Sequence, residues 1–505
     1  MPYVHTNPQN HSSNRQTLSH IQLIRMWAAV LCLIALLAVG ISRWLHGWAN
    51  PKCENGILPP GSMGFPIIGE TIEFFSPYFF YDIPPFIKKR MQRYGPVFRT
   101  SLVGRKVIVS TDPEINHEIF QQENKSFLIW YTKTFIEVFG QQSLVAHHGM
   151  VHKYLKNLIL QLVSPENLKG KLLYEIDKAT RKHLNSWASL GTIDVKEGSG
   201  EMIFEYFAKK LIGYEEETAS NKKLRNNFQA FIDGLISFPL NIPGTVYHAC
   251  LRGRKNACKV IKDIFEKRKA SKFPHNDFLD HLLNEVESQD SYLNEQMAIE
   301  LVFALLFATY ETTSAAITLA IKFISDHPKV LEELTKEHEA ILRSRDNENS
   351  ELTWQEYKSM TFTHMVINET VRLANIVPGI FRKVMKDVEM KGYTIPAGWT
   401  VMVVPAAVHL SPGKYENPLE FNPWRWEGKE LHVGSKTFMA FGGGIRLCVG
   451  ADFAKLQMAI FIHYIVTKYR WTVMKGGDIA RKPGLTFPNG LHIKISEKQA
   501  MPRSF

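Results

Sequence analysis

The residues best suited to chemistry lie near the C-terminal end, where residues 441–450 read FGGGIRLCVG and lead into an apolar stretch that predicts a helix. The glycines permit tight turns and close backbone approach. Cys448 would sit at the start of that helix, where free N–H groups and the helix dipole stabilise a thiolate. A thiolate is a metal ligand, and a lone one without a second cysteine nearby suits the axial position of a haem iron.

Two other interpretations of this stretch stay open when Cys448 is considered alone. A free cysteine is usually a small buried apolar residue. A glycine loop before a helix can also bind a phosphate, although the spacing is neither Gly-x-Gly-x-x-Gly nor a lysine-bearing P-loop. The neighbouring residues favour haem. Phe441 would cover the flank of the sulfur, Arg446 could hold a propionate, and a flat group could lie against Gly450.

The order Phe-x-x-Gly-x-Arg-x-Cys-x-Gly is matched at every fixed position and resembles the haem-binding signature of the cytochrome P450 superfamily. The resemblance extends from residue 58 to the C-terminus. It implies a mostly α-helical fold with a small β region, a b-type haem ligated by Cys448, and monooxygenation with O2. Because no NADPH fingerprint is found in the sequence, it also implies that NADPH supplies electrons through a separate NADPH-cytochrome P450 reductase.

A second reactive stretch lies within residues 294–325, which are apolar nearly all round and predict one long buried helix. Glu311 and Thr312 interrupt this apolar character, and polar groups there are costly unless paired. Thr312 could simply bond its own backbone. The resemblance implies instead that Glu311 and Thr312 deliver protons during oxygen activation, while Ala308, one turn earlier, leaves room for dioxygen. Thr309 stands where the family usually has glycine, and its hydroxyl could bond the backbone.

A charged group of residues follows in the chain. Glu369 and Arg372 are three apart on one predicted helix face, a spacing that is usually a surface ion pair of little worth. The resemblance adds Arg425, from the string PWRW, and implies a buried network of these three that holds the core on the haem side. Its role would be structural.

Further cations would complete a haem site. The segment HHGMVHKYLK resembles the superfamily helix whose Trp and Arg hold a propionate, and His152 and Lys156 occupy those places, which keeps one cation. Arg382 matches the position of another propionate ligand. His148 and His152 could alternatively bind zinc, but neither a glutamate nor a third ligand accompanies them.

The resemblance also implies an apolar substrate pocket. Residues 127–145 predict an irregular aromatic loop over it. The string FPLNIPGT ends any helix and resembles the access region of plant members that oxidise sterols, brassinosteroids and triterpenoids. The pocket residues expected from the long helix and from the segment 374–380 are Phe303, Phe307, Val377 and Ile380.

The N-terminal end is typical of a retained membrane anchor. Residues 1–25 form a polar leader without acids, and residues 26–42 are an apolar run without charge. This run is short of the roughly 20 residues that span a bilayer, but flanking tryptophans supply interfacial anchors. A signal peptide and an organelle-targeting leader are the alternatives. Residues 43–57 would be a linker and residues 58–505 the haem-thiolate monooxygenase domain.

Composition limits the partners. The 505 residues carry a formal charge of +11, which suggests an anionic surface or an acidic protein as neighbour, and no basic run interleaved with aromatics points to nucleic acid. Five irregularly spaced cysteines favour a reducing compartment. With the resemblance, this predicts a single-pass protein of the endoplasmic reticulum membrane whose catalytic domain faces the cytosol. Lys153, Lys436 and Lys455 are candidates for contact with the reductase.

The sequence therefore predicts a plant microsomal enzyme that hydroxylates a sterol or tetracyclic triterpenoid, from the clan of brassinosteroid oxidases and cucurbitane hydroxylases. Repeated side-chain hydroxylation could also cleave a carbon–carbon bond, converting a sterol to a pregnane. Other classes stay open: an isomerase or dehydratase that uses haem without dioxygen, a haem electron carrier, and an anchored binding protein without haem. The intact Glu311 and Thr312 argue against the first of these.

Overall fold

The computed structural model describes residues 10–79, 81–214, 221–271, 273–347, 350–429, 435–482 and 484–498. Residues 1–9 of the predicted leader lie outside this range. The α-helices are α1 Asn10–Ala49, α2 Thr71–Phe74, α3 Pro85–Tyr94, α4 Pro113–Gln121, α5 Lys133–Phe139, α6 Gly149–Leu162, α7 Pro165–Asn167, α8 Leu173–Leu190, α9 Val195–Ile212, α10 Asn221–Gly234, α11 Val246–Ala270, α12 Phe278–Glu287, α13 Glu295–Asp326, α14 Pro328–Arg343, α15 Trp354–Ser359, α16 Thr361–Ala374, α17 Pro405–His409 and α18 Ala451–Lys468. Shorter helical turns are η1 Leu144–Ala146, η2 Leu168–Leu172, η3 Pro423–Trp426 and η4 Gly444–Arg446.

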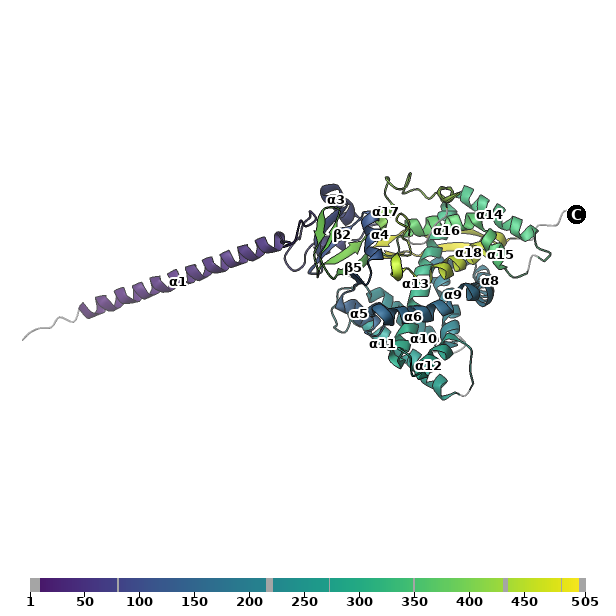
Figure 1. The fold of residues 1–505 in the computed structure, drawn as a ribbon, viewed down its shortest axis with the longest axis horizontal. Helices are drawn as coiled ribbons and strands as arrows, with labels where there is room; N and C mark the ends of the chain where they lie inside the picture. Colours follow the sequence, from purple (N-terminus) through teal and green to yellow (C-terminus); the bar gives the residue numbers. More distant parts are fainter. Residues whose placement is uncertain are drawn as a thin grey trace, which may run out of the picture.

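The strands form a small β region beside the helices, as the sequence predicts. The largest sheet has the order β1-β2-β8-β5-β3, and a second sheet has the order β4-β12-β9. Figure 1 shows β2 and β5 at the end of the globular part from which α1 departs. The strands are β1 Val97–Leu102, β2 Arg105–Ser110, β3 Phe127–Ile129, β4 Thr192–Asp194, β5 Ile380–Val384, β6 Val388–Met390, β7 Tyr393–Ile395, β8 Thr400–Val403, β9 Tyr469–Gly476, β10 Ala480–Arg481, β11 Leu485–Thr486 and β12 Leu491–Glu497.

The long central helix α13 has the limits that the sequence predicts. The Asn294 side chain accepts a hydrogen bond from the Met297 N–H at 2.9 Å and so caps the first turn. Along its length α13 packs against α9, α11, α16 and α18. Apolar side chains cover almost its whole circumference because the neighbouring helices bury it from several sides. This helix and α18 are the two elements that position the candidate site.

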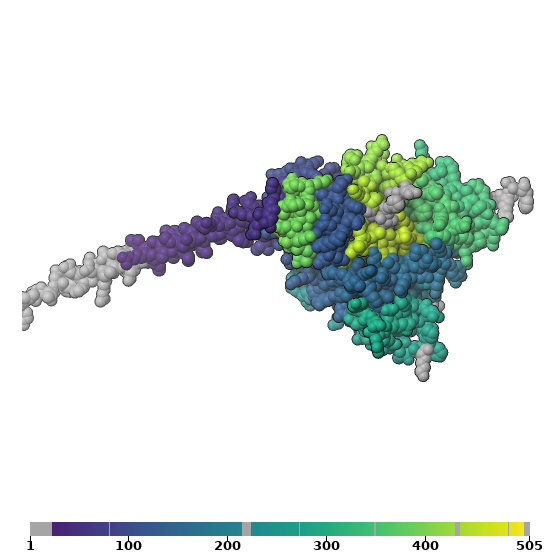
Figure 2. Space-filling view, in the orientation of Figure 1, coloured from purple at the N-terminus to yellow at the C-terminus, as the bar shows by residue number. Residues whose placement is uncertain are grey.

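The N-terminal helix α1 projects from the globular part, and its described side chains other than Trp48 are exposed (Figures 1 and 2). The segment Leu23–Ala49 is long and apolar enough to cross a membrane. Its 27 residues extend roughly 40 Å, against a hydrocarbon core of about 30 Å. The helix continues past residue 42, where hydropathy placed the end of the anchor, because Arg43 interrupts the apolar run without interrupting the backbone. Trp48 Nε1 donates to Gly64 O at 3.2 Å.

One predicted loop contains regular structure. Residues 127–145 include β3, α5 and η1. The Thr132 hydroxyl accepts from the Phe135 N–H at 3.2 Å and starts α5, a capping signal that the aromatic composition of the segment conceals.

Candidate functional site

Residues 441–450 form the loop that carries Cys448, called the cysteine loop below, and a backbone hydrogen bond closes this loop. Cys448 lies between η4 and α18, and its N–H donates to the carbonyl of Phe441 at 3.0 Å. Gly444 has φ +62°, and a Cβ at Gly443 would lie 2.5 Å from the Phe120 ring. The glycines therefore allow both the turn and the close approach of α4, as predicted.

The Cys448 thiol lies at the start of α18, and its side chain retains accessible surface. Burial among protein atoms nevertheless raises the pKa of this thiol, while the Gly450 N–H and the Lys156 ammonium oppose the change. The Gly450 N–H at the helix start thus favours the thiolate, as the sequence predicts, but burial outweighs it. A bound metal cation would supply the missing positive charge. A Cβ at Gly450 would meet no atom within 4 Å, so a flat group has room there.

The middle of α13 presents a small residue toward open space. Ala308 is exposed, although Leu306 and Tyr310 on the same helix are buried. Thr312 Oγ1 donates to Ala308 O at 2.7 Å, and Thr309 Oγ1 donates to Leu305 O at 2.8 Å. Both hydroxyls therefore bond the backbone, and helical hydrogen bonding continues through the segment. An exposed alanine inside a buried helix fits a bound planar group on this face of α13.

Glu311 has a partner that sequence reasoning missed. Lys196, in the first turn of α9, contacts Glu311 Oε2 at 2.8 Å and Ser314 Oγ at 2.9 Å. The ion pair is partly exposed, with about a fifth of each side chain accessible. Glu311 and Lys196 are 115 positions apart, and no local pattern links them. The lysine holds the carboxylate in one orientation.

The two arginines predicted to hold propionates meet around a third residue, Glu123. Arg382 Nε lies 2.5 Å from Glu123 Oε2, and Arg446 Nε donates to Glu123 Oε1 at 3.3 Å. All three side chains are almost completely buried. Glu123 follows α4 in a turn and belongs to no motif that the sequence displays, so only the fold reveals it.

Of the other predicted cofactor contacts, only Lys156 provides a cation. Burial lowers the pKa of His152 to about 4, so this side chain is neutral near pH 7. Lys156 Nζ donates to Ile445 O at 2.8 Å, next to Arg446. His148 precedes α6 rather than sharing its face with His152. Within the described residues, no group of three or more His, Cys, Asp or Glu could hold a metal ion, so the zinc alternative has no support.

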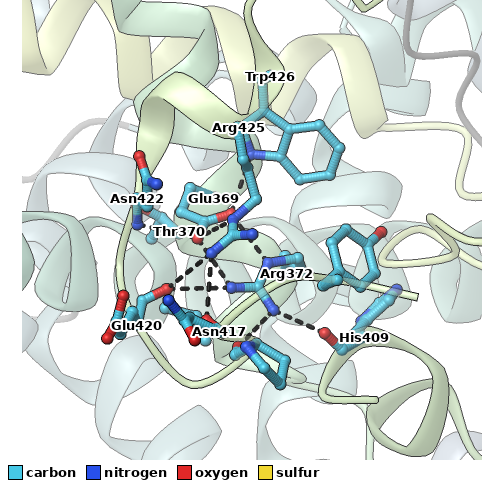
Figure 3. A network of polar contacts seen from close by, with 12 residues as sticks. Glu369, Thr370, Arg372, His409, Asn417, Glu420, Asn422, Arg425 and Trp426 are labelled. Atoms are coloured by element: carbon cyan, nitrogen blue, oxygen red, sulfur yellow. Dashed lines mark hydrogen bonds and ion pairs between the residues drawn. The ribbon is translucent and has the colours of Figure 1, made fainter. Parts of the chain in front are cut away.

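The structure brings Glu369, Arg372 and Arg425 together in a buried network (Figure 3). Arg372 makes two contacts of 2.8 Å with the Glu369 carboxylate, and Arg425 Nε adds a third at 2.8 Å. Trp426 Nε1 also donates to this carboxylate, at 3.0 Å. The remaining guanidinium donors bond carbonyl oxygens of residues 409 and 416–420.

A buried histidine links this network to the cysteine loop. The carbonyl of His409 accepts from Arg372 Nη1 at 2.6 Å, while its ring Nε2 accepts from the Met439 N–H at 3.0 Å. Its Nδ1 faces Asn375 Oδ1 at 2.8 Å and therefore carries the hydrogen. Burial lowers the pKa of His409 to about 3, which keeps the ring neutral as both bonds require.

The predicted pocket residues differ in exposure. Phe303 is completely buried, with its ring 4.8 Å from Phe228 and 4.9 Å from Phe231, so it presents no surface to a substrate. The prediction for Phe303 is wrong because the α10 rings cover that face of α13. Phe307 and Ile380 are partly exposed, and 49% of Val377 is accessible.

Comparison with known proteins gives a consistent result. The family model described as "Cytochrome P450" matches residues 59–497. Cytochrome P450 87A3 of Oryza sativa subsp. japonica is 55% identical over 94% of this chain and 92% of its own length. Cucurbitadienol 11-hydroxylase of Siraitia grosvenorii is 40% identical over 94% of this chain and 100% of its own length. The solved structure of retinoic acid bound cyanobacterial CYP120A1 covers 88% of this chain and 100% of that one, with 26% identity and a TM-score of 0.77.

Proposed function

The chain belongs to the cytochrome P450 family and is a cytochrome P450 monooxygenase, and from this premise we propose that it hydroxylates a tetracyclic triterpenoid or a sterol. The observation that carries the proposal is the 40% identity, over the full length of the relative, to an enzyme named for hydroxylating cucurbitadienol. The family implies a haem with a cysteine thiolate ligand, O2, a hydrophobic substrate and a redox partner. The relative named as a hydroxylase favours this function over an isomerase, an electron carrier and a haem-free binding protein.

We assign the haem contacts to residues of the cysteine loop and its surroundings. Cys448 Sγ would be the iron ligand, and Phe441 and Gly450 would lie beside it. Arg382, Arg446 and Lys156 would hold the propionates, and Ala308 would face the opposite side of the ring. When bound, the haem supplies oxygen activation and the insertion of one oxygen atom into a C–H bond. The protein supplies one thiolate, the cationic side chains, and a face of α13 on which Ala308 has only a small side chain.

Proton delivery would come from Glu311 and Thr312. Thr312 Oγ1 donates to Ala308 O, so its lone pairs remain free to accept a hydrogen bond from water. Glu311, held by Lys196, is the preceding residue on α13 and would be the group that exchanges protons. Thr312→Ala should therefore retain the haem but divert reducing equivalents to peroxide. Product formation with unchanged coupling would contradict this role.

The substrate would bind among apolar side chains that the structure leaves partly exposed. Phe307 contacts the Phe139 ring at 5.4 Å and the Phe231 ring at 5.2 Å. Ile380 and Val377 would supply aliphatic surface. Broad apolar walls with few polar groups suit a rigid polycyclic molecule.

The proposed setting is the endoplasmic reticulum membrane, with α1 as a single-pass anchor and the catalytic domain facing the cytosol. A separate NADPH-cytochrome P450 reductase would deliver the electrons. Of the three candidate lysines for contact with it, Lys153 and Lys436 are exposed. Lys455 is less suited, because it is half-buried and its Nζ lies 5.7 Å from the centroid of the Phe441 ring.

Product analysis tests the substrate class. The full chain is co-expressed with a plant reductase and supplied with cucurbitadienol, β-amyrin and common plant sterols, and the extracts are examined by mass spectrometry. We expect a tetracyclic substrate to gain one oxygen atom, and a pregnane would reveal the predicted side-chain cleavage. Cys448→Ala is the control and should form no product. Unchanged tetracyclic substrates, with a normal thiolate–haem spectrum, would refute the substrate class.

A further inference from the structure

Glu123 and the neighbouring strand β3 are joined to two segments that are far away in the chain. Its carboxylate contacts Arg382 on β5 and Arg446 in the cysteine loop, and Oε1 also accepts from the Ile129 N–H of β3 at 3.0 Å. Only 1% of the Glu123 side chain is accessible. Two hydrogen bonds to Oε1 and one ion pair at Oε2 hold this buried carboxylate, and they hold the two guanidinium groups beside it.

In each of these two arginines, one terminal nitrogen has no hydrogen-bond partner among the described residues. Arg382 Nε forms an ion pair with Glu123, and its Nη1 donates to Phe381 O. Arg446 Nε donates to Glu123, and its Nη2 donates to His147 O and faces His148 Nδ1. Among the described residues, no partner is found for Arg382 Nη2 or Arg446 Nη1. Neither nitrogen is among the fully buried side-chain atoms that lack a partner, so both keep accessible surface from which they can donate to a ligand.

The charges around Glu123 also do not balance. Arg382, Arg446 and Lys156 contribute three positive charges and Glu123 contributes one negative charge, which leaves two positive charges. His152 adds none, because burial lowers its pKa to about 4. A haem carries two propionates, so one haem would neutralise the excess.

We propose that Glu123 is a positioning residue for the cofactor: it orients Arg382 and Arg446 so that their unused terminal nitrogens point to the haem propionates. Glu123 itself does not touch the haem. It binds the inner edge of both guanidinium groups and thereby sets how tightly the cofactor is held. This inference rests on the proposed haem site at Cys448.

Replacing Glu123 by glutamine tests the proposal, because glutamine keeps the shape and removes the charge. The holoenzyme is purified, and the rate of haem transfer to excess apomyoglobin is measured together with the propionate bending modes in the resonance Raman spectrum. Loss of a charge-assisted hydrogen bond should speed haem transfer about tenfold. The propionate modes should shift, while the thiolate-specific band with carbon monoxide is retained.

Glu118→Gln is the matched control, since Glu118 is an exposed carboxylate on α4 that bonds Gln122. This variant should lose haem at the wild-type rate. Faster loss in both variants, or faster loss from Glu123→Gln without a shift of the propionate modes, would indicate general loosening and overturn the proposal. A wild-type rate in Glu123→Gln would overturn it as well.

Glu123→Asp keeps the inference falsifiable if the glutamine variant fails to fold. Aspartate keeps the charge but is one methylene too short to reach both arginines, so an intermediate rate and an intermediate Raman shift are expected. A wild-type rate would contradict the proposal. A wild-type protein without the thiolate band would refute the proposed function itself, whereas a normal band with an unchanged Glu123 variant refutes only this inference.

Discussion

Two buried clusters of this protein have the same composition, one carboxylate and two arginines, and differ in how completely they are bonded. In the Glu369 cluster every guanidinium nitrogen of Arg372 and Arg425 donates to a carboxylate or a carbonyl oxygen. In the Glu123 cluster, Arg382 and Arg446 each leave one terminal nitrogen without a partner among the described residues.

The difference separates a structural cluster from a binding one. Burying charged groups is costly, and the cost is offset only when nearly every donor and acceptor is bonded. The Glu369 cluster meets this requirement with protein atoms alone, so it needs no ligand. The Glu123 cluster meets it only when another anion binds. Unpaired donors on arginines that are otherwise buried are therefore a better indication of a cofactor site than the presence of arginine.

The largest effect is expected from Arg372→Met, which removes one arginine from the fully bonded Glu369 cluster. It removes two donors from Glu369 and leaves carbonyl oxygens of the segment 409–420 without their hydrogen bonds to Arg372. The free energy of unfolding should therefore fall by about 3–5 kcal/mol. The yield of folded, haem-containing protein should fall with it, as measured by urea unfolding and the haem spectrum. Glu332→Gln, which breaks an exposed pair with Lys336, should leave stability unchanged. Equal effects of the two variants would contradict the comparison.

Arg382→Met should lower the free energy of unfolding less than Arg372→Met does, but it should weaken haem retention more strongly. Glu123 keeps Arg446 as a partner, so the expected loss of stability is about 1–3 kcal/mol. Haem transfer to apomyoglobin should be at least tenfold faster, because the proposed donor to a propionate is removed. A variant that folds poorly yet retains haem as firmly as the wild type would reverse the assigned roles of the two clusters.

His409→Gln tests the link between the Glu369 cluster and the cysteine loop. The folded-state pKa of His409 is about 3, below its ordinary value of 6.5, so between these values the unfolded chain binds a proton that the folded protein excludes. The stability that comes from the neutral ring is fully present above pH 6.5 and falls by about 1.4 kcal/mol per unit as the pH decreases below it. Urea unfolding from pH 7.5 to 5 should therefore give a flatter curve for the variant. Parallel curves would exclude His409 as a source of the pH dependence.

The smallest change in stability is expected from Lys196→Met, which breaks the partly exposed pair with Glu311. Solvent screens this pair, so the free energy of unfolding should change by less than about 1 kcal/mol. The product formed per NADPH should still fall a few-fold, because Glu311 loses its fixed orientation. Lys322→Met, which breaks the pair with Asp326 on the same helix, is the control and should not alter coupling. Identical coupling in both variants would show that the Lys196–Glu311 ion pair does not contribute to the proposed proton delivery.

Much of the local structure could be predicted from the sequence. The long helix has the predicted cap at Asn294, the turn at Gly444 uses the positive φ that glycine permits, and Arg372 meets Glu369 as their spacing indicates. These features depend on residues close in the chain, so local physical rules apply to them. Glu123, Lys196 and the covering of Phe303 depend on segments more than fifty residues apart, which leave no local pattern.

The sequence by itself determined the thiol, the glycine turn before it, the long apolar helix and the apolar N-terminal run. Only the tertiary structure decided how the buried charges are partnered. Hydrophobic periodicity records which face of an element is buried, whereas a buried ion pair depends on atoms brought within about 3 Å by separate elements. Whether a buried arginine is fully bonded or still has a donor for a ligand is thus a property of the fold.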